Sequence, residues 1–280
     1  MLNYVVWNVD PVMLRLGSLE VRYYGLLFAL GFLIGYYIMR FFFKKENSPQ
    51  SEIDKMALYI ILGSVIGARL GHCLFYEPEV YLADPIQILY VWQGGLASHG
   101  GAIGLIIGLA LYSIRSWNHS LLHILDRVAV PTALAGSFIR LGNLFNSEIY
   151  GYETDLPWGF VFIRDGQTTP HHPTQIYESL GYMIIFGVLM LMYLRRKGII
   201  NRGFLVGWMV TLVFVLRFFV EFIKNVQVDF EQNMTLNMGQ LLSIPFIVGG
   251  IALILISKKL GPAPEWKPER GGSKKKETTS

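Results

Sequence analysis

Charged residues and cysteine are both scarce in this chain. Only 16% of its 280 residues are charged, whereas 52% are hydrophobic. Soluble domains carry about 25% charged residues, so the composition excludes an ordinary soluble domain and indicates a protein that crosses a membrane several times. The single cysteine, Cys73, excludes an intrachain disulfide and a zinc site built from several thiolates. The HExxH pattern of zinc enzymes is also missing, and we expect neither a metal nor a cofactor.

The start of the chain lacks the basic region of a secretory signal peptide. Asp10, Pro11 and Arg15 interrupt its apolar residues, so we expect this segment to be retained and to lie along the outer membrane interface. The formal net charge of +4 is accounted for by basic loops and a basic tail. No nucleic-acid partner is therefore expected.

Long apolar runs, in contrast, are abundant. Each is about 20 residues long, enough to cross a hydrocarbon core of about 30 Å. The runs lie at 24–43, 55–75, 96–115, 121–142, 174–194, 203–222 and 237–257. They predict an all-α polytopic membrane protein with about seven transmembrane helices.

Lysine and arginine gather in every second connection between these runs. The residues concerned are Arg40, Lys44, Lys45, Arg115, Arg195, Arg196, Lys197, Arg202, Lys258 and Lys259. Short basic loops stay in the cytoplasm. The N-terminus is therefore predicted to lie outside and the C-terminus inside.

Three segments fall outside the apolar runs. Residues 77–95 carry Tyr and Trp but too short an apolar core to span, which predicts an arm lying in the interface. Residues 146–173 alternate aromatic and turn residues, as a small outer cap with β structure would. We divide the chain into a transmembrane domain, 1–260, that includes the arm and the cap, and a disordered, basic cytoplasmic tail, 261–280.

Polar side chains inside the runs gather toward the outer side. A charge at bilayer depth costs about 2.5 to 3.5 kcal/mol, so such residues are candidates for function. The candidates are Tyr23, Tyr24, Arg69, His72, His99, Arg140, Asn143, His172, Gln175, Arg217 and Glu221. Asp126 and Arg127 lie near the inner face instead, where we expect an interfacial pair or an anchor.

Arg140 and Arg217 are the strongest of these candidates. Each shares a helix face with a polar partner, Asn143 three residues on and Glu221 four residues on. Two arginines facing one cavity repel each other unless an anion joins them, and the planar guanidinium suits a lipid phosphate. The alternative for any one arginine, Arg69 included, is that it bridges helices or reaches toward the interface.

His99 opens an apolar run beside Gly100, Gly101 and Gly104. Glycine lets another backbone or a ligand approach closely, so these neighbours favour a functional histidine. The adjacent His171 and His172 are better interpreted as part of the cap than as metal ligands.

Several motifs resemble those of the bacterial prolipoprotein diacylglyceryl transferases. In chain order they are YYGLLFALG (23–31), WQGGLASHGGAIG (92–104), RLGNLFNSEIYG (140–151), HPTQIYES (172–179) and RFFVEFIK (217–224). The resemblance covers the chain except its C-terminal tail. It implies an enzyme of the bacterial inner membrane, in which the outer N-terminus would be periplasmic. A monomer is our default expectation. Such an enzyme moves the diacylglyceryl group of phosphatidylglycerol to the lipobox cysteine of a preprolipoprotein and releases glycerol phosphate.

The same resemblance implies which positions are critical. They are Tyr24, His99, Arg140, Asn143, Glu148, Gly151, Arg217 and Glu221. The arginines are expected both to bind the phosphate and to act in catalysis, together with Tyr24, His99 and Glu221. The remaining positions are expected to bind substrate.

The identity of the base stays open at this point. The substrate thiol must lose its proton, because the thiolate is the nucleophile. His99 fits the proton acceptor, while Glu221 or Glu148 would fit if His99 only positions a headgroup hydroxyl. Asn143 is expected to tie the loop that follows its helix, and Gly151 to occupy a backbone conformation closed to other residues.

Two other classes of protein compete with an enzyme. A transporter or channel needs polar groups toward both faces and commonly shows repeated halves, whereas the candidates here are one-sided and no repeat is evident. A lipid-binding scaffold without catalysis would explain the arginines but leaves His99 and Glu221 without a role.

Overall fold

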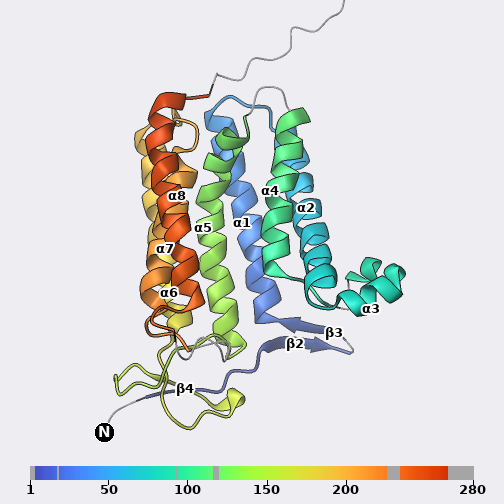
Figure 1. Ribbon diagram of the computed structural model, residues 1–280, viewed down its shortest axis with the longest axis vertical. Coiled ribbons are helices and arrows are strands. Elements are labelled where there is room, and N and C mark those ends of the chain that lie inside the picture. Colours follow the sequence, from blue (N-terminus) through green and yellow to red (C-terminus); the bar gives the residue numbers. More distant parts are fainter. Residues whose placement is uncertain (1–3, 18, 92–93, 116–119, 226–233, 264–280) are drawn as a thin grey trace, which may run out of the picture.

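Seven long helices form a bundle in the computed structural model, which describes residues 4–17, 19–91, 94–115, 120–225 and 234–263 (Figure 1). The helices are α1 (Tyr23–Lys45), α2 (Ser51–Phe75), α4 (Ser98–Arg115), α5 (Leu121–Phe145), α6 (Thr174–Arg195), α7 (Phe204–Val220) and α8 (Met238–Leu260). Five of them are long and apolar enough to cross a membrane, and α4 and α7 are shorter apolar helices. The predicted all-α polytopic fold is confirmed.

The two ends of the bundle differ in chemistry. Helices α1, α6 and α8 end in basic residues at what we call the basic end, and Lys44, Lys45, Lys258 and Lys259 lie in last turns there. Cations in a last turn interact favourably with the negative end of the helix dipole. The strands lie at the opposite end, which we call the cap end (Figure 1).

Helix α5 lies at the centre of the bundle. Its most apolar window is 56% buried, against 17–33% for the other four candidate spans. Small residues allow close packing around it, because Gly31 of α1 faces Ala135 and Gly136 faces the ring of Tyr182 on α6. The side chains that α5 carries are therefore surrounded by protein more than by lipid.

Helices α2 and α4 pack through glycines spaced four residues apart. Gly67 of α2 faces Gly100 and Gly104 of α4, and a Cβ atom at any of the three would collide with backbone across the interface. Such spacing brings two membrane helices into close contact. The glycines beside His99 thus admit a second backbone, and the alternative that Gly100 and Gly104 leave room for a ligand is wrong.

The cap includes a segment from the start of the chain. Strand β1 (Val5–Trp7) pairs in parallel with β4 (Phe160–Phe162), and β2 (Val12–Leu16) pairs antiparallel with β3 (Leu19–Arg22). The Trp7 indole N–H donates to the Leu144 carbonyl at 3.0 Å. The sequence predicted an interfacial segment here, and pairing of a three-residue strand with the cap was not foreseen because such short strands leave little periodicity.

The segment predicted as an arm folds into α3 (Pro78–Ala83) and a 3₁₀ helix, η1 (Pro85–Leu89), at the cap end of α2 (Figure 1). Arg69 of α2 holds it, since its guanidinium donates to the carbonyls of Gln87, Ile88 and Gly94 at 2.6 to 2.9 Å. The side chain of Arg69 is 2% exposed, so this arginine joins segments of the protein. Residues 92–93 of the segment lie outside the described residues, as does the predicted tail from residue 264 on.

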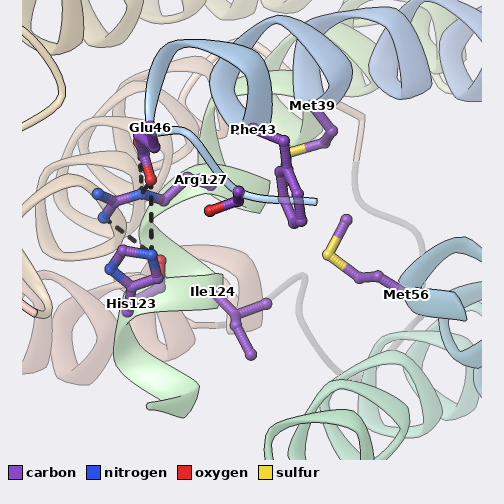
Figure 2. A pocket seen from close by; sticks show the side chains of 8 residues that line it. Met39, Phe43, Glu46, Met56, His123, Ile124 and Arg127 are labelled. Carbon is purple, nitrogen blue, oxygen red and sulfur yellow. Dashed lines mark hydrogen bonds and ion pairs between the residues drawn. The ribbon is translucent and has the colours of Figure 1, made fainter. Parts of the chain in front are cut away.

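The basic end of the bundle also holds buried charged side chains. Figure 2 shows Glu46, His123 and Arg127 meeting beside a small pocket whose other walls include Met39 and Phe43. Arg127 Nε lies 3.1 Å from Glu46 Oε1, and the Arg127 guanidinium also donates to the Gly198 carbonyl at 3.1 Å. These contacts make Arg127 the expected anchor, with Glu46 as its ionic partner.

Asp126 anchors a different helix. Its carboxylate accepts the backbone N–H groups of Gly203 at 2.7 Å and Val206 at 3.0 Å. Gly203 has a positive φ of 88° and precedes the first residue of α7. A side chain of α5 thus satisfies the unpaired donors with which α7 begins.

Candidate active site

Five charged side chains of alternating sign form a continuous series at the cap end, which we call the ion-pair chain. It runs from Arg140 on α5 through Glu178 on α6, Lys224 and Glu221 after α7, to Arg217 on α7. The successive nitrogen to oxygen distances are 3.0, 3.6, 3.6 and 3.4 Å. Three helices thus bring together charges that are far apart in sequence.

Burial is greatest in the middle of the ion-pair chain. The side chains of Glu178, Lys224 and Glu221 are 1%, 3% and 9% exposed, whereas those of Arg140 and Arg217 are 15% and 37% exposed. Burial lowers the pKa of the Lys224 ammonium, and Glu178 and Glu221 act against that shift. The two ends that solvent or a ligand can reach are both arginines.

The anions facing the two arginines are the protein's own. A lipid phosphate was expected between Arg140 and Arg217, and the structure instead gives each arginine a carboxylate, Glu178 and Glu221 respectively. An arginine has five N–H donors, and an ion pair with one carboxylate uses only some of them. A phosphate can therefore bind at the same guanidinium groups.

A loop after α5 continues the site from Arg140. The guanidinium donates to Asn143 Oδ1 at 3.3 Å, and Asn143 Nδ2 donates to Glu148 Oε1 at 2.8 Å. The backbone N–H of Glu148 also donates to the Asn143 carbonyl at 3.1 Å. The expectation that Asn143 ties the departing loop is confirmed.

That loop contains two residues in the left-handed backbone region. Ser147 has a φ of 55° and Ile149 a φ of 62°, and a β-branched residue adopts such a φ only at a cost. Gln175 Nε2 donates to the Glu148 carbonyl at 2.7 Å, and Thr174 Oγ1 donates to the Ile149 carbonyl at 2.8 Å. The first turn of α6 thus holds the strained loop that presents Glu148.

Gly151 is explained by close approach. A Cβ atom there would meet the Ile223 carbonyl oxygen, and it would lie 2.9 Å from atoms of His172 and Thr174. Gly151 is not among the glycines with positive φ, so the predicted special backbone conformation is wrong. The missing side chain lets the cap reach the backbone beside Lys224, with which Gly151 forms an isolated bridge.

Tyr24 and His99 lie differently with respect to this site. The Tyr24 ring packs against Gly142 and lies within electrostatic range of Glu148 and Arg140. His99 is exposed near the start of α4, and within the described part of the chain no hydrogen bond or ion pair involves its side chain. The structure therefore gathers seven of the eight predicted positions and leaves His99 without a contact to them.

The structure adds Glu178, Lys224 and Asn237 to the site. Glu178 and Lys224 lie in the motifs at 172–179 and 217–224, but neither received a defined role from the sequence. Glu178 lies inside an apolar run, so the cost of a charge at bilayer depth could have identified it. Asn237 caps α8 and its side-chain amide donates to Glu221 Oε2 at 3.2 Å. No local sequence pattern predicts the contact between Asn237 and Glu221, because it depends on how α7 and α8 pack.

Fold and site together define a polytopic membrane protein with a largely buried network of charges at one end of its bundle. The family model described as prolipoprotein diacylglyceryl transferase matches residues 11–256. The chain belongs to this family, as its motifs predicted.

Relatives match over nearly their whole length. A phosphatidylglycerol–prolipoprotein diacylglyceryl transferase of Tolumonas auensis is 49% identical over 253 residues, which are 90% of this chain and 97% of the relative. One of Chloroherpeton thalassium is 47% identical over 257 residues, 92% of this chain and 96% of the relative. One of Porphyromonas gingivalis is 46% identical, covering 91% of this chain and 95% of the relative.

Proposed function

We propose that this protein transfers the diacylglyceryl group of phosphatidylglycerol to the lipobox cysteine of a preprolipoprotein, the first step of bacterial lipoprotein maturation. Membership of the prolipoprotein diacylglyceryl transferase family supports this class of reaction. The observation that carries the site is the ion-pair chain, whose two more exposed ends, Arg140 and Arg217, are guanidinium groups suited to a phosphate.

The reaction forms one bond and breaks another. The cysteine thiolate attacks the glyceryl carbon that bears the phosphate ester, a thioether forms, and the carbon to oxygen bond breaks so that glycerol phosphate leaves. Negative charge grows on the departing phosphate, and preorganised cations placed there lower the barrier. Arg140 and Arg217 are proposed to supply them, with Tyr24, Asn143 and Glu148 lining the headgroup site.

A base must take the thiol proton. Glu221 lies 3.4 Å from Arg217 and 3.6 Å from Lys224, and it also accepts a hydrogen bond from Asn237. Accepting a proton would weaken each of those contacts. The exposed imidazole of His99 makes no hydrogen bond or ion pair within the described residues. A neutral imidazole accepts a proton near neutral pH. We therefore assign the base to His99.

Orientation follows from the two ends of the bundle. Lysine and arginine in the last turns of α1, α6 and α8 favour a cytoplasmic basic end. The cap, the arm (77–95) and the site then face the periplasm, with the N-terminus there and the C-terminus in the cytoplasm of a bacterial inner membrane. A monomer is proposed, because one chain contributes every residue of the ion-pair chain.

Purified protein, phosphatidylglycerol and a synthetic lipobox peptide test this function. The peptide cysteine is expected to gain the mass of a diacylglyceryl group, and a peptide with serine in its place is expected to gain nothing. A transporter or a lipid-binding scaffold would leave both peptides unmodified. An unmodified cysteine peptide, with the protein folded and lipid present, would overturn the proposal.

A further inference from the structure

Arg140 and Arg217 are joined only indirectly. They lie on α5 and α7, and the ion pairs found among the described residues connect them through Glu178, Lys224 and Glu221. Glu221 is four residues from Arg217 and three from Lys224, so that half of the series is local. Among the ion pairs that the described residues contribute to this series, those that cross between helices both involve Glu178.

Glu178 contacts a different cation with each carboxylate oxygen. Oε2 lies 3.0 Å from Arg140 Nε, and Oε1 lies 3.6 Å from Lys224 Nζ. Neither oxygen has a hydrogen-bond partner of good geometry within the described part of the chain. A buried carboxylate without hydrogen bonds depends on its neighbouring cations, and they depend on it in turn. Movement of one of the three groups is therefore resisted by the other two.

We infer that Glu178 is a positioning residue that fixes Arg140 relative to Arg217, acting through Lys224 and Glu221. This inference rests on the proposed function. Two guanidinium groups stabilise a departing phosphate only when their spacing fits it, and a spacing set in advance by buried ion pairs costs no rearrangement during the reaction. Without the Glu178 charge, Arg140 and Lys224 face each other as like charges.

The first test is Glu178→Gln, which keeps the size and removes the charge. We expect kcat of transfer to fall about 100-fold while KM for phosphatidylglycerol changes less than about threefold, since displaced arginines still attract an anionic lipid but no longer fit the transition state. Ser179→Ala is the matched control, because Ser179 shares a buried 2.8 Å hydrogen bond with Ser137 between the same two helices. It should keep its kcat.

The second test is a double-mutant cycle with Lys224→Met. If Glu178 and Lys224 act as one bridge, the kcat of the double variant should be about equal to that of the less active single variant. Once either substitution has removed the bridge, the second has nothing further to remove. Losses that multiply would mean that the two side chains act separately, and this would overturn the inference.

Glu178→Asp keeps the test available if Glu178→Gln does not fold. It retains the charge on a shorter side chain, and we expect a loss of about tenfold in kcat with KM unchanged. Full kcat in either variant, in an assay where the unmutated protein makes product, overturns the inference and leaves the proposed function standing. An unmutated protein that makes no product refutes the function itself.

Discussion

Both ends of the bundle bury charged side chains, but the charges have different partners. At the basic end Asp126 accepts two backbone N–H groups, and Arg127 donates to a backbone carbonyl in addition to its ion pair with Glu46. At the cap end Arg140 and Arg217 pair with the side chains of Glu178 and Glu221.

Contacts to backbone fix where a helix begins or a loop runs, and giving them up would disturb the fold. Contacts between side chains leave the backbone free of this constraint, and an arginine paired with one carboxylate still has further donors for a ligand. The comparison supports our proposal that buried charge is an anchor at the basic end and a binding site at the cap end.

The largest expected effect is on stability at the basic end. Arg127→Leu leaves the Glu46 carboxylate without its arginine, and removing one member of a buried pair costs about 3–5 kcal/mol of unfolding free energy. Unfolding in detergent should show this loss, while transfer by the folded variant at low temperature stays normal. Lys44→Leu, an exposed change at the same end, is the control. An unchanged unfolding free energy in Arg127→Leu would mean that this end is no anchor.

Removal of the cap-end arginines should mainly affect activity. Arg140→Ala and Arg217→Ala are each expected to lower kcat about 10²–10³-fold, as for loss of one donor to a developing anion. Arg217→Ala should barely alter the melting temperature because that side chain is 37% exposed. Arg140→Ala should lower the melting temperature, because it leaves the buried Glu178 carboxylate with one cation. Near-normal transfer by either variant would end the phosphate-binding role.

His99 lies outside both groups of charges and tests the assignment of the base. His99→Gln should lower kcat about 100-fold, the lower range for a general base, and regain part of it at high pH, where more of the substrate thiol ionises unaided. His123→Gln at the basic end is the matched control, with an unaltered pH profile. An active His99→Gln with the profile of the unmutated protein would move the assignment to Glu221.

Gly151→Ala should have the smallest effect. The added Cβ meets the Ile223 carbonyl, and overpacking of this kind costs about 1–3 kcal/mol. Because the same strip of backbone carries Lys224, we expect transfer to fall about tenfold along with stability. Gly166→Ala in the cap, where a Cβ has open space but φ is 75°, separates backbone strain from close approach. A larger loss at Gly166 would contradict our account of Gly151.

Differences between predicted and observed helix limits have a simple origin. The run predicted at 55–75 begins earlier as α2 at Ser51, because Glu52 and Asp54 occupy its first turn. The run predicted at 237–257 continues as α8 to Leu260, through Lys258 and Lys259. Hydropathy marks only the apolar part of a helix, and the polar first and last turns lie outside it.

The sequence alone predicted the seven long helices of the bundle, the asymmetry of basic residues and most of the candidate site. Each of these depends on residues close together in the chain: the length of an apolar run, the i, i+3 and i, i+4 spacing of Arg140 with Asn143 and of Arg217 with Glu221, and the cost of charge at bilayer depth.

The tertiary structure decided which groups meet across helices. Packing of α6 between α5 and the end of α7 gave Arg140 and Lys224 their shared carboxylate, Glu178. Packing of α2 against α4 placed Gly100 and Gly104 in contact with the α2 backbone. The pairing of β1 with β4 likewise joins segments far apart in the chain. Such pairings are set by the summed packing energy of whole helices, which no local pattern of residues contains.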